Sequence, residues 1–250
     1  MNKLVLIIAL VASTVYTYAQ ELITDRPDQT ESAQVVPLHS LQIESGYVFE
    51  TKIQLGEKTI TANSTLLRYG IIKDFELRLG VDYSIYTPKT GAAKLKGFNP
   101  IYVGFKLEFT NEDGVFPGIA LLGGLGIPKI ASEDFKTDRI APDLRLAFSH
   151  TFSEKLSLGY NVAIEWDGNH NMPVGVYTVA LGLGLTEKFG CYIEAFGDIW
   201  NKEGVQQLAD GGLTFLLYDN LQIDASAGIG LNDMATDYYL SAGLSWRIPR

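Results

Sequence analysis

The chain has 250 residues, with 29 acidic and 20 basic side chains and a net charge of −9. This acidic balance argues against nucleic-acid binding, because nucleic-acid-binding proteins present clustered Lys and Arg to the phosphates. Hydrophobic residues make up 46% of the chain, yet beyond the first 19 residues no run of about 18 apolar residues offers a transmembrane helix. Cys191 is the only cysteine, which excludes an intramolecular disulfide.

The first 19 residues have the three parts of a secretory signal peptide. Lys3 supplies a positive charge, residues 4–11 are continuously apolar, and Thr17-Tyr18-Ala19 places small residues at the cleavage positions. Residues 1–19 are therefore predicted to be a Sec signal peptide that is removed before Gln20. A buried N-terminal helix or strand is the alternative.

Residues 75–110 contain two long segments in which apolar and polar residues alternate. In the first, Phe75, Leu77, Leu79 and Val81 share one face, and Glu76, Arg78 and Asp82 share the other. Successive side chains of a strand point to opposite sides of a sheet, so each segment has one apolar and one polar face. Strands of about 9–11 residues with this repeat are typical of transmembrane β-barrels. A soluble secreted β protein, normally with shorter strands, is the alternative.

Similar segments recur along the rest of the chain. We expect strands at 41–51, 60–71, 75–86, 100–110, 116–128, 142–150, 156–165, 174–185, 191–200, 205–217, 221–231 and 238–248. The connections between them are alternately short and longer, as in outer-membrane barrels with short periplasmic turns. The predicted fold is all-β: a single transmembrane antiparallel β-barrel of about twelve strands, an up-and-down meander over residues 41–250. Ten strands is the alternative count.

Residues 20–40 precede the first strand and carry the string Thr24-Asp25-Arg26-Pro27-Asp28-Gln29-Thr30-Glu31-Ser32. This string resembles the N-terminal motif of a family of bacterial outer-membrane "transporter" barrels named for a meta-pathway (MetA-pathway) of phenol degradation. The segments 191–197, with Glu194, and 210–214 are similar too. The resemblance covers the whole barrel and implies a channel in the outer membrane of a Gram-negative bacterium for small, aromatic or hydrophobic solutes.

The motif is too polar, and too interrupted by proline, to be a membrane strand. Its charged residues Asp25, Arg26, Asp28 and Glu31 are candidates for a plug that pairs with charges inside the barrel, and a solvated periplasmic leader is the alternative. The inward-facing parity predicts lumen-lining charges at Arg68, Glu76, Arg78, Asp82, Lys106, Glu108, Asp143, Arg145, Glu194 and Asp224. Acidic residues predominate among the inward charges, which favours a neutral or cationic solute over an anion.

The predicted function is a channel or transporter, with a closed structural or adhesion barrel as the alternative. An outer-membrane lipid hydrolase is a third hypothesis, but His39, His150 and His170 are scattered and form no predicted dyad with a serine. We therefore predict no catalytic residue, no metal site and no cofactor. The expected partners are outer-membrane lipid, the barrel-insertion machinery and a small solute.

Overall fold

A computed structural model of the chain describes residues 22–52, 56–89 and 92–248. Nearly all regular structure in these ranges is β-strand, and no helix of the described residues is long and apolar enough to cross a membrane. The predicted signal peptide, residues 1–19, lies outside the described residues. The strands are β1 (Leu41–Lys52), β2 (Glu57–Ile72), β3 (Phe75–Thr87), β4 (Leu95–Phe98), β5 (Ile101–Thr110), β6 (Gly118–Ile127), β7 (Ala141–Ser153), β8 (Leu156–Glu165), β9 (Val174–Gly184), β10 (Phe189–Trp200), β11 (Gly204–Tyr218), β12 (Leu221–Gly230) and β13 (Tyr238–Arg247).

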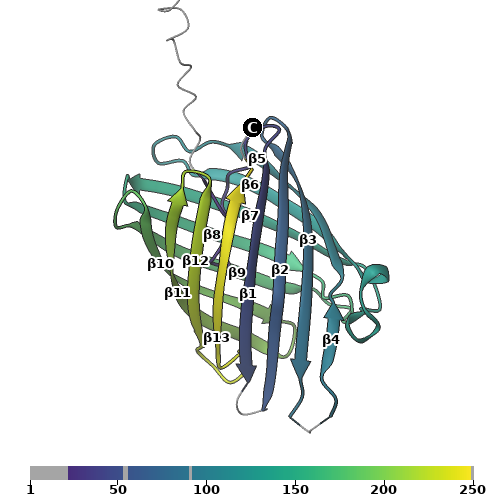
Figure 1. Ribbon diagram of the computed structural model, residues 1–250. Coiled ribbons are helices and arrows are strands. Elements are labelled where there is room, and N and C mark those ends of the chain that lie inside the picture. Colours follow the sequence, from purple (N-terminus) through teal and green to yellow (C-terminus); the bar gives the residue numbers. More distant parts are fainter. Residues whose placement is uncertain (1–21, 53–55, 90–91, 249–250) are drawn as a thin grey trace, which may run out of the picture.

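These strands form a closed antiparallel barrel (Figure 1). Each long strand pairs with the next one along the chain, and β1 closes the ring by pairing with β13, with Gly46 opposite Gly243. Twelve of these strands form the barrel wall. The short β4 is not counted among them, because it pairs only with part of β3. The predicted all-β, twelve-stranded meander is therefore confirmed.

The strand β4 lies within residues that the sequence analysis placed in a loop. β3 pairs with β5 over its first half, Phe75–Gly80, and with β4 over its second half, Tyr83–Tyr86. The break between β4 and β5 falls at Asn99 and Pro100, and a proline has no N–H to donate to a strand ladder. The loop between β6 and β7 closes against β4, where Ser132 and Phe98 exchange hydrogen bonds.

The distribution of apolar and polar side chains is the reverse of that in a soluble protein. Its outer surface exposes large apolar side chains all around the ring, for example Leu79, Val103, Val162, Ile193 and Leu240. The largest fully buried side chains face the lumen instead and are mostly charged or polar. This alternation lets the outer face contact hydrocarbon. Because the ring of strands is closed, the backbone N–H and C=O groups of each strand can bond to a neighbouring strand.

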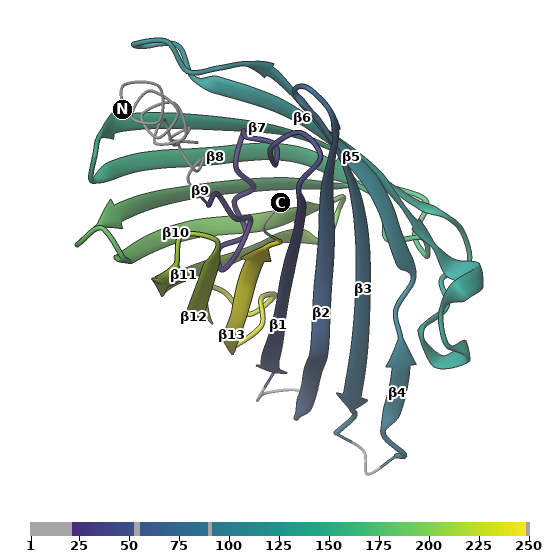
Figure 2. The same cartoon turned by 45° about the horizontal axis from the view of Figure 1, so that its top comes forward.

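The described part of the N-terminal segment, residues 22–40, lies inside the barrel (Figure 2). Just before β1 it forms a parallel bridge between Leu38 and Gly70 of β2, and the His39 N–H donates to the Gly70 carbonyl at 2.6 Å. The segment enters at the barrel end where β1 begins and β13 finishes, the end predicted to face the periplasm.

The topology predicts which connections are reachable from each side of the outer membrane. In a Cys191→Ser background, a cysteine at the exposed Asp138, in the β6–β7 loop, should react with an impermeant maleimide on intact cells. A cysteine at the exposed Asp113, in the β5–β6 turn, should react only after the outer membrane is permeabilised. The opposite labelling pattern would show that the barrel is inserted in the other orientation.

Candidate functional site: the occupied lumen

The backbone of the N-terminal segment is held by side chains from all around the barrel wall. Because the described residues before Leu38 pair with no strand, their N–H groups need other acceptors in the interior. Six of them donate to wall side chains at 2.7–3.3 Å: Asp25 to Glu44, Gln29 to Glu194, Glu31 to Asn161, Ala33 to Ser149, Val35 to Glu108, and Val36 to Glu76. The acceptors come from β1, β10, β8, β7, β5 and β3. The segment is therefore docked specifically.

Three buried cations of the wall converge on one carboxylate of the segment. Arg68 of β2, Arg78 of β3 and Lys106 of β5 lie 2.9, 3.0 and 2.9 Å from the Asp25 carboxylate, whose side chain is 2% exposed. Burial alone raises the pKa of Asp25, but the charges of Arg68, Lys106 and Arg78 outweigh it and hold the pKa well below its usual range. Asp25 is thus ionised in the docked segment.

Further carboxylates complete this ion-pair network. Glu31 of the segment makes a bidentate pair with Arg78, both distances being 2.9 Å. On the wall, Glu44 and Glu76 each lie 2.9 Å from the Arg68 guanidinium. Buried ions are tolerated only when they are paired and hydrogen-bonded, and removing one partner costs about 3–5 kcal/mol. The network therefore couples the docked segment to four adjacent strands, β1, β2, β3 and β5.

On the strands next to this network, Arg26 docks against the seam between the first and last strands. Its guanidinium lies 2.9 Å from Asp224 of β12 and donates to Ser241 of β13 at 3.1 Å. A Cβ atom at Gly46 or at Gly243 would clash with this guanidinium where it now lies. Glycine at these two facing positions therefore leaves room for Arg26, which a larger residue would displace.

Asp28 differs from Asp25 because no cation pairs with it among the described ion pairs. Burial, followed by the negative charge of Glu194, raises its pKa well above the usual value. Glu194 itself accepts from the Gln29 N–H at 2.8 Å and from the Thr30 hydroxyl. Nearby, the Tyr192 and Tyr239 hydroxyls both donate to Asp210. This part of the lumen is acidic, and no ion pair between described residues links a cation to Asp28, Glu194 or Asp210.

The structure places the predicted lumenal charges in three groups. Arg68, Glu76, Arg78 and Lys106 share the Asp25 network, while Glu108, Arg145, Glu194 and Asp224 contact the segment separately. Asp82 and Asp143 line cavities and form no ion pair with the described residues. Lys106 pairs with Asp25 and, at 3.5 Å, with Glu31, both from the docked segment.

Several lumenal residues outside the predicted set also contact the segment. Gln42, Asn161, Thr178 and Ser149 are uncharged side chains that bond the segment or its anchors. Their inward parity on the predicted strands is the sequence signal that indicates them. The same parity turns the buried Glu44 inward.

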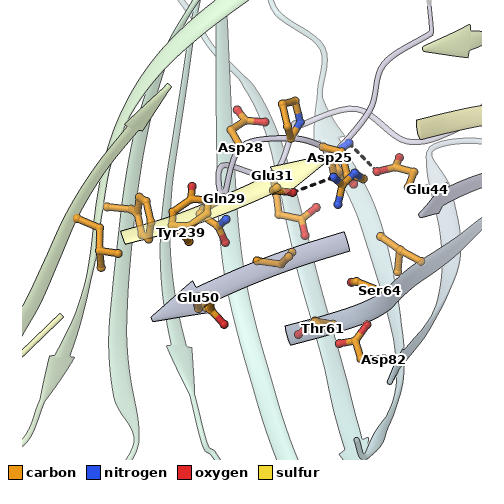
Figure 3. A pocket seen from close by; sticks show the side chains of 17 residues that line it. Asp25, Asp28, Gln29, Glu31, Glu44, Glu50, Thr61, Ser64, Asp82 and Tyr239 are labelled. Atoms are coloured by element: carbon orange, nitrogen blue, oxygen red, sulfur yellow. Dashed lines mark hydrogen bonds between the residues drawn. The ribbon is translucent and has the colours of Figure 1, made fainter. Parts of the chain in front are cut away.

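The docked segment divides the lumen into separate cavities. On the predicted extracellular side, a cavity of about 360 Å³ is lined by acidic residues of the segment and wall together with Phe196, Leu208 and Tyr239 (Figure 3). A cavity of about 490 Å³ opens among the turns at the other end, including residues 153–159. A third, of about 320 Å³, lies beside Tyr102 and Asp143.

Two conservative substitutions in the motif should have opposite effects on docking. Asp25→Asn leaves three buried cations short of one anion, so hydrogen exchange of residues 24–36 should rise on the order of tenfold or more. Asp28→Asn removes an unpaired buried carboxylate, so exchange of the same peptide should fall at neutral pH. The measurement is exchange mass spectrometry of the refolded barrel. Equal hydrogen exchange of residues 24–36 in the two variants would contradict the different roles assigned to Asp25 and Asp28.

The pH dependence follows from the same two groups. The raised pKa of Asp28 means that its contribution to docking is present at low pH and is lost as pH rises through that pKa. The lowered pKa of Asp25 means that its contribution is lost only when pH falls through that lowered value.

Solved structures with the same architecture include an outer membrane channel of Pseudomonas putida F1, with a TM-score of 0.71 and 12% identity over 90% of this chain and 100% of that one. The KdgM porin superposes with a TM-score of 0.58 and 9% identity, over 83% of this chain and 99% of the porin. At these identities the similarity establishes the barrel fold. A search of curated proteins gave no match. The family model described as "Putative MetA-pathway of phenol degradation" matches residues 24–248, from the docked motif to the end of β13, and the chain therefore belongs to that family.

Proposed function

We propose that this protein is an outer-membrane channel for small solutes in which the docked N-terminal segment is the gate. The observation that carries the proposal is the presence of cavities on both sides of the segment, which share Arg26, Pro27, Asp28 and Glu31 as lining residues. Displacement of a few residues of the segment would join them. The family description and the channel and porin named among similar structures support the same function.

The cavity on the predicted extracellular side supports a solute class. Its carboxylates Asp28, Glu50 and Asp82 have no ion-pair partner among the described residues, and its one arginine, Arg26, is bound to Asp224. Apolar and aromatic side chains, including Leu66, Leu208, Phe196 and Tyr239, form the rest of the wall. Such a lining favours a small neutral or cationic molecule with an apolar or aromatic body over an anion.

A closed structural barrel is the main alternative, because the same ion pairs would also hold the segment permanently. The lipid-hydrolase hypothesis has less support. His150 stacks between Tyr160 and Phe152 on the outer face, whereas His170 binds Asp167 in the β8–β9 loop and His39 adjoins β1. The three histidines therefore lie in separate places.

Weakening the segment's anchors should open the channel. Asp25→Asn combined with Glu31→Gln removes the charges that the segment contributes to the network, so single-channel conductance in planar bilayers should increase several-fold. Glu133→Gln, at an exposed loop carboxylate that pairs with Lys136, is the matched control and should conduct like the wild type. Unchanged conductance in the double variant, with the barrel folded on heat-modifiability gels, would favour the closed structural barrel.

Selectivity should depend on the unpaired carboxylates. Glu50→Gln combined with Asp82→Asn leaves the Asp25 network intact, so the open barrel should keep its conductance and lose cation preference. The measurement is the reversal potential in a salt gradient, together with liposome uptake of benzylamine and of benzyl alcohol as charged and neutral probes. Uptake of benzylamine should fall relative to benzyl alcohol. An unchanged ratio would show that these two carboxylates do not select the solute.

A further inference from the structure

A polar cluster interrupts the apolar outer surface on β1 and β2. Ser45 pairs with Thr65 across these strands, and Asn63 lies on the same outward face. The Asn63 carbonyl oxygen accepts from the Ser45 hydroxyl at 3.1 Å and from the Thr65 hydroxyl at 2.7 Å. The alternate positions Glu44, Ser64 and Arg68 face the lumen, which fixes the outward direction of the cluster.

The cluster lies within the apolar band and not at its edge. Toward the periplasmic end it is followed by the cross-strand pair Ile43 and Leu67, and toward the other end by the pair Phe49 and Ile60. Leu244 of β13 lies beside Ser45, and Val81 of β3 lies beside Thr65. Polar side chains at this depth are costly when they face lipid, and they are found where they meet another polar surface.

The hydrogen-bonding capacity of the cluster is not used up internally. The hydroxyls of Ser45 and Thr65 both donate to the side-chain oxygen of the exposed Asn63. The Asn63 NH₂ donates to none of the described residues. The hydroxyl oxygens of Ser45 and Thr65 retain acceptor capacity. Acyl chains at this depth offer no acceptor for the amide, whereas a second copy of the same cluster offers both donors and acceptors.

Small outward residues also lie on the strands next to the cluster. Ala242 of β13, opposite Tyr47, pairs with Ala225 of β12. Farther round the ring, Ala227 pairs with Gly211 of β11, and Ala209 of β11 pairs with Ala195 of β10, with large exposed residues such as Leu240, Leu213 and Ile193 between them. Small residues let two membrane proteins approach at backbone distance. Ala242 lies on β13, the strand beside β1, so the polar cluster and this small residue together form one face with both directional bonds and close approach.

We propose that this face, centred on β1, β2 and β13, is the contact surface of a symmetric dimer of two barrels in the membrane. A two-fold axis brings the same patch of both copies together, and the free amide of each Asn63 then meets hydroxyl oxygens of its partner. A self-complementary set of donors and acceptors fits a second copy of this chain better than an unrelated protein.

The test compares two triple variants in lipid. Ser45→Ala, Asn63→Leu and Thr65→Val removes the polar groups, and Val162→Leu, Val179→Leu and Leu181→Val on β8 and β9 is the control elsewhere on the outer face. Subunit counting by single-molecule photobleaching in bilayers should show dimers for the wild type and the control. The dimer fraction of the polar-cluster variant should fall about tenfold, since interchain polar contacts in membranes are individually modest. Heat modifiability on gels shows that each variant is folded.

Crosslinking in cells distinguishes the possible partners. With Cys191→Ser, a cysteine at the exposed Ala62 should give a dimer of this chain on oxidation, whereas a cysteine at Val162 should not. A monomeric wild type in bilayers, equal dimer fractions in both triple variants, or a crosslink from residue 62 to a different protein would each overturn the proposal.

Discussion

The neutralisation of Arg68, Arg78 and Lys106 by Asp25 is the interaction on which the arrangement of the lumen depends. Three cations on neighbouring strands repel one another. Of the wall residues, Glu44 and Glu76 pair with Arg68, and Glu76 also lies 3.5 Å from Arg78. The carboxylate that reaches all three cations comes from the segment. Barrel wall and segment are therefore electrostatically incomplete without each other, which explains why a polar, proline-containing segment lies inside the barrel at all.

This dependence changes what the lumenal charges can do. Because Arg78 and Lys106 are bound to the segment, reversing their charge would expel Asp25 and Glu31 before it altered the selectivity of an open pathway. In the channel that we propose, the residues available to a passing solute are the unpaired ones, such as Glu50 and Asp82, which lie around the cavity and outside the network. Under that proposal, anchoring and selection are carried by different carboxylates.

The sequence predicts the barrel well because lipid imposes a strict two-residue alternation, and the predicted family is confirmed by the match over residues 24–248. It also predicts which side chains face inward, since parity alone decides this. It does not predict that Lys106 would bond Asp25, because that contact joins residues 81 positions apart through a segment without periodicity. β4 was missed since only four residues pair, next to Pro100. The role of the lumenal residues in selection stays a prediction.

The glycines beneath Arg26 have a consequence for how the barrel is assembled. Gly46 and Gly243 belong to the first and last strands, which become neighbours only when the ring closes. The recess that accepts the Arg26 guanidinium therefore does not exist in an open sheet. Asp224, its ionic partner, lies on the strand next to the last and is likewise among the final parts to be synthesised. The N-terminal segment is synthesised before these strands, so its arginine gains a binding place only after the last strands have paired.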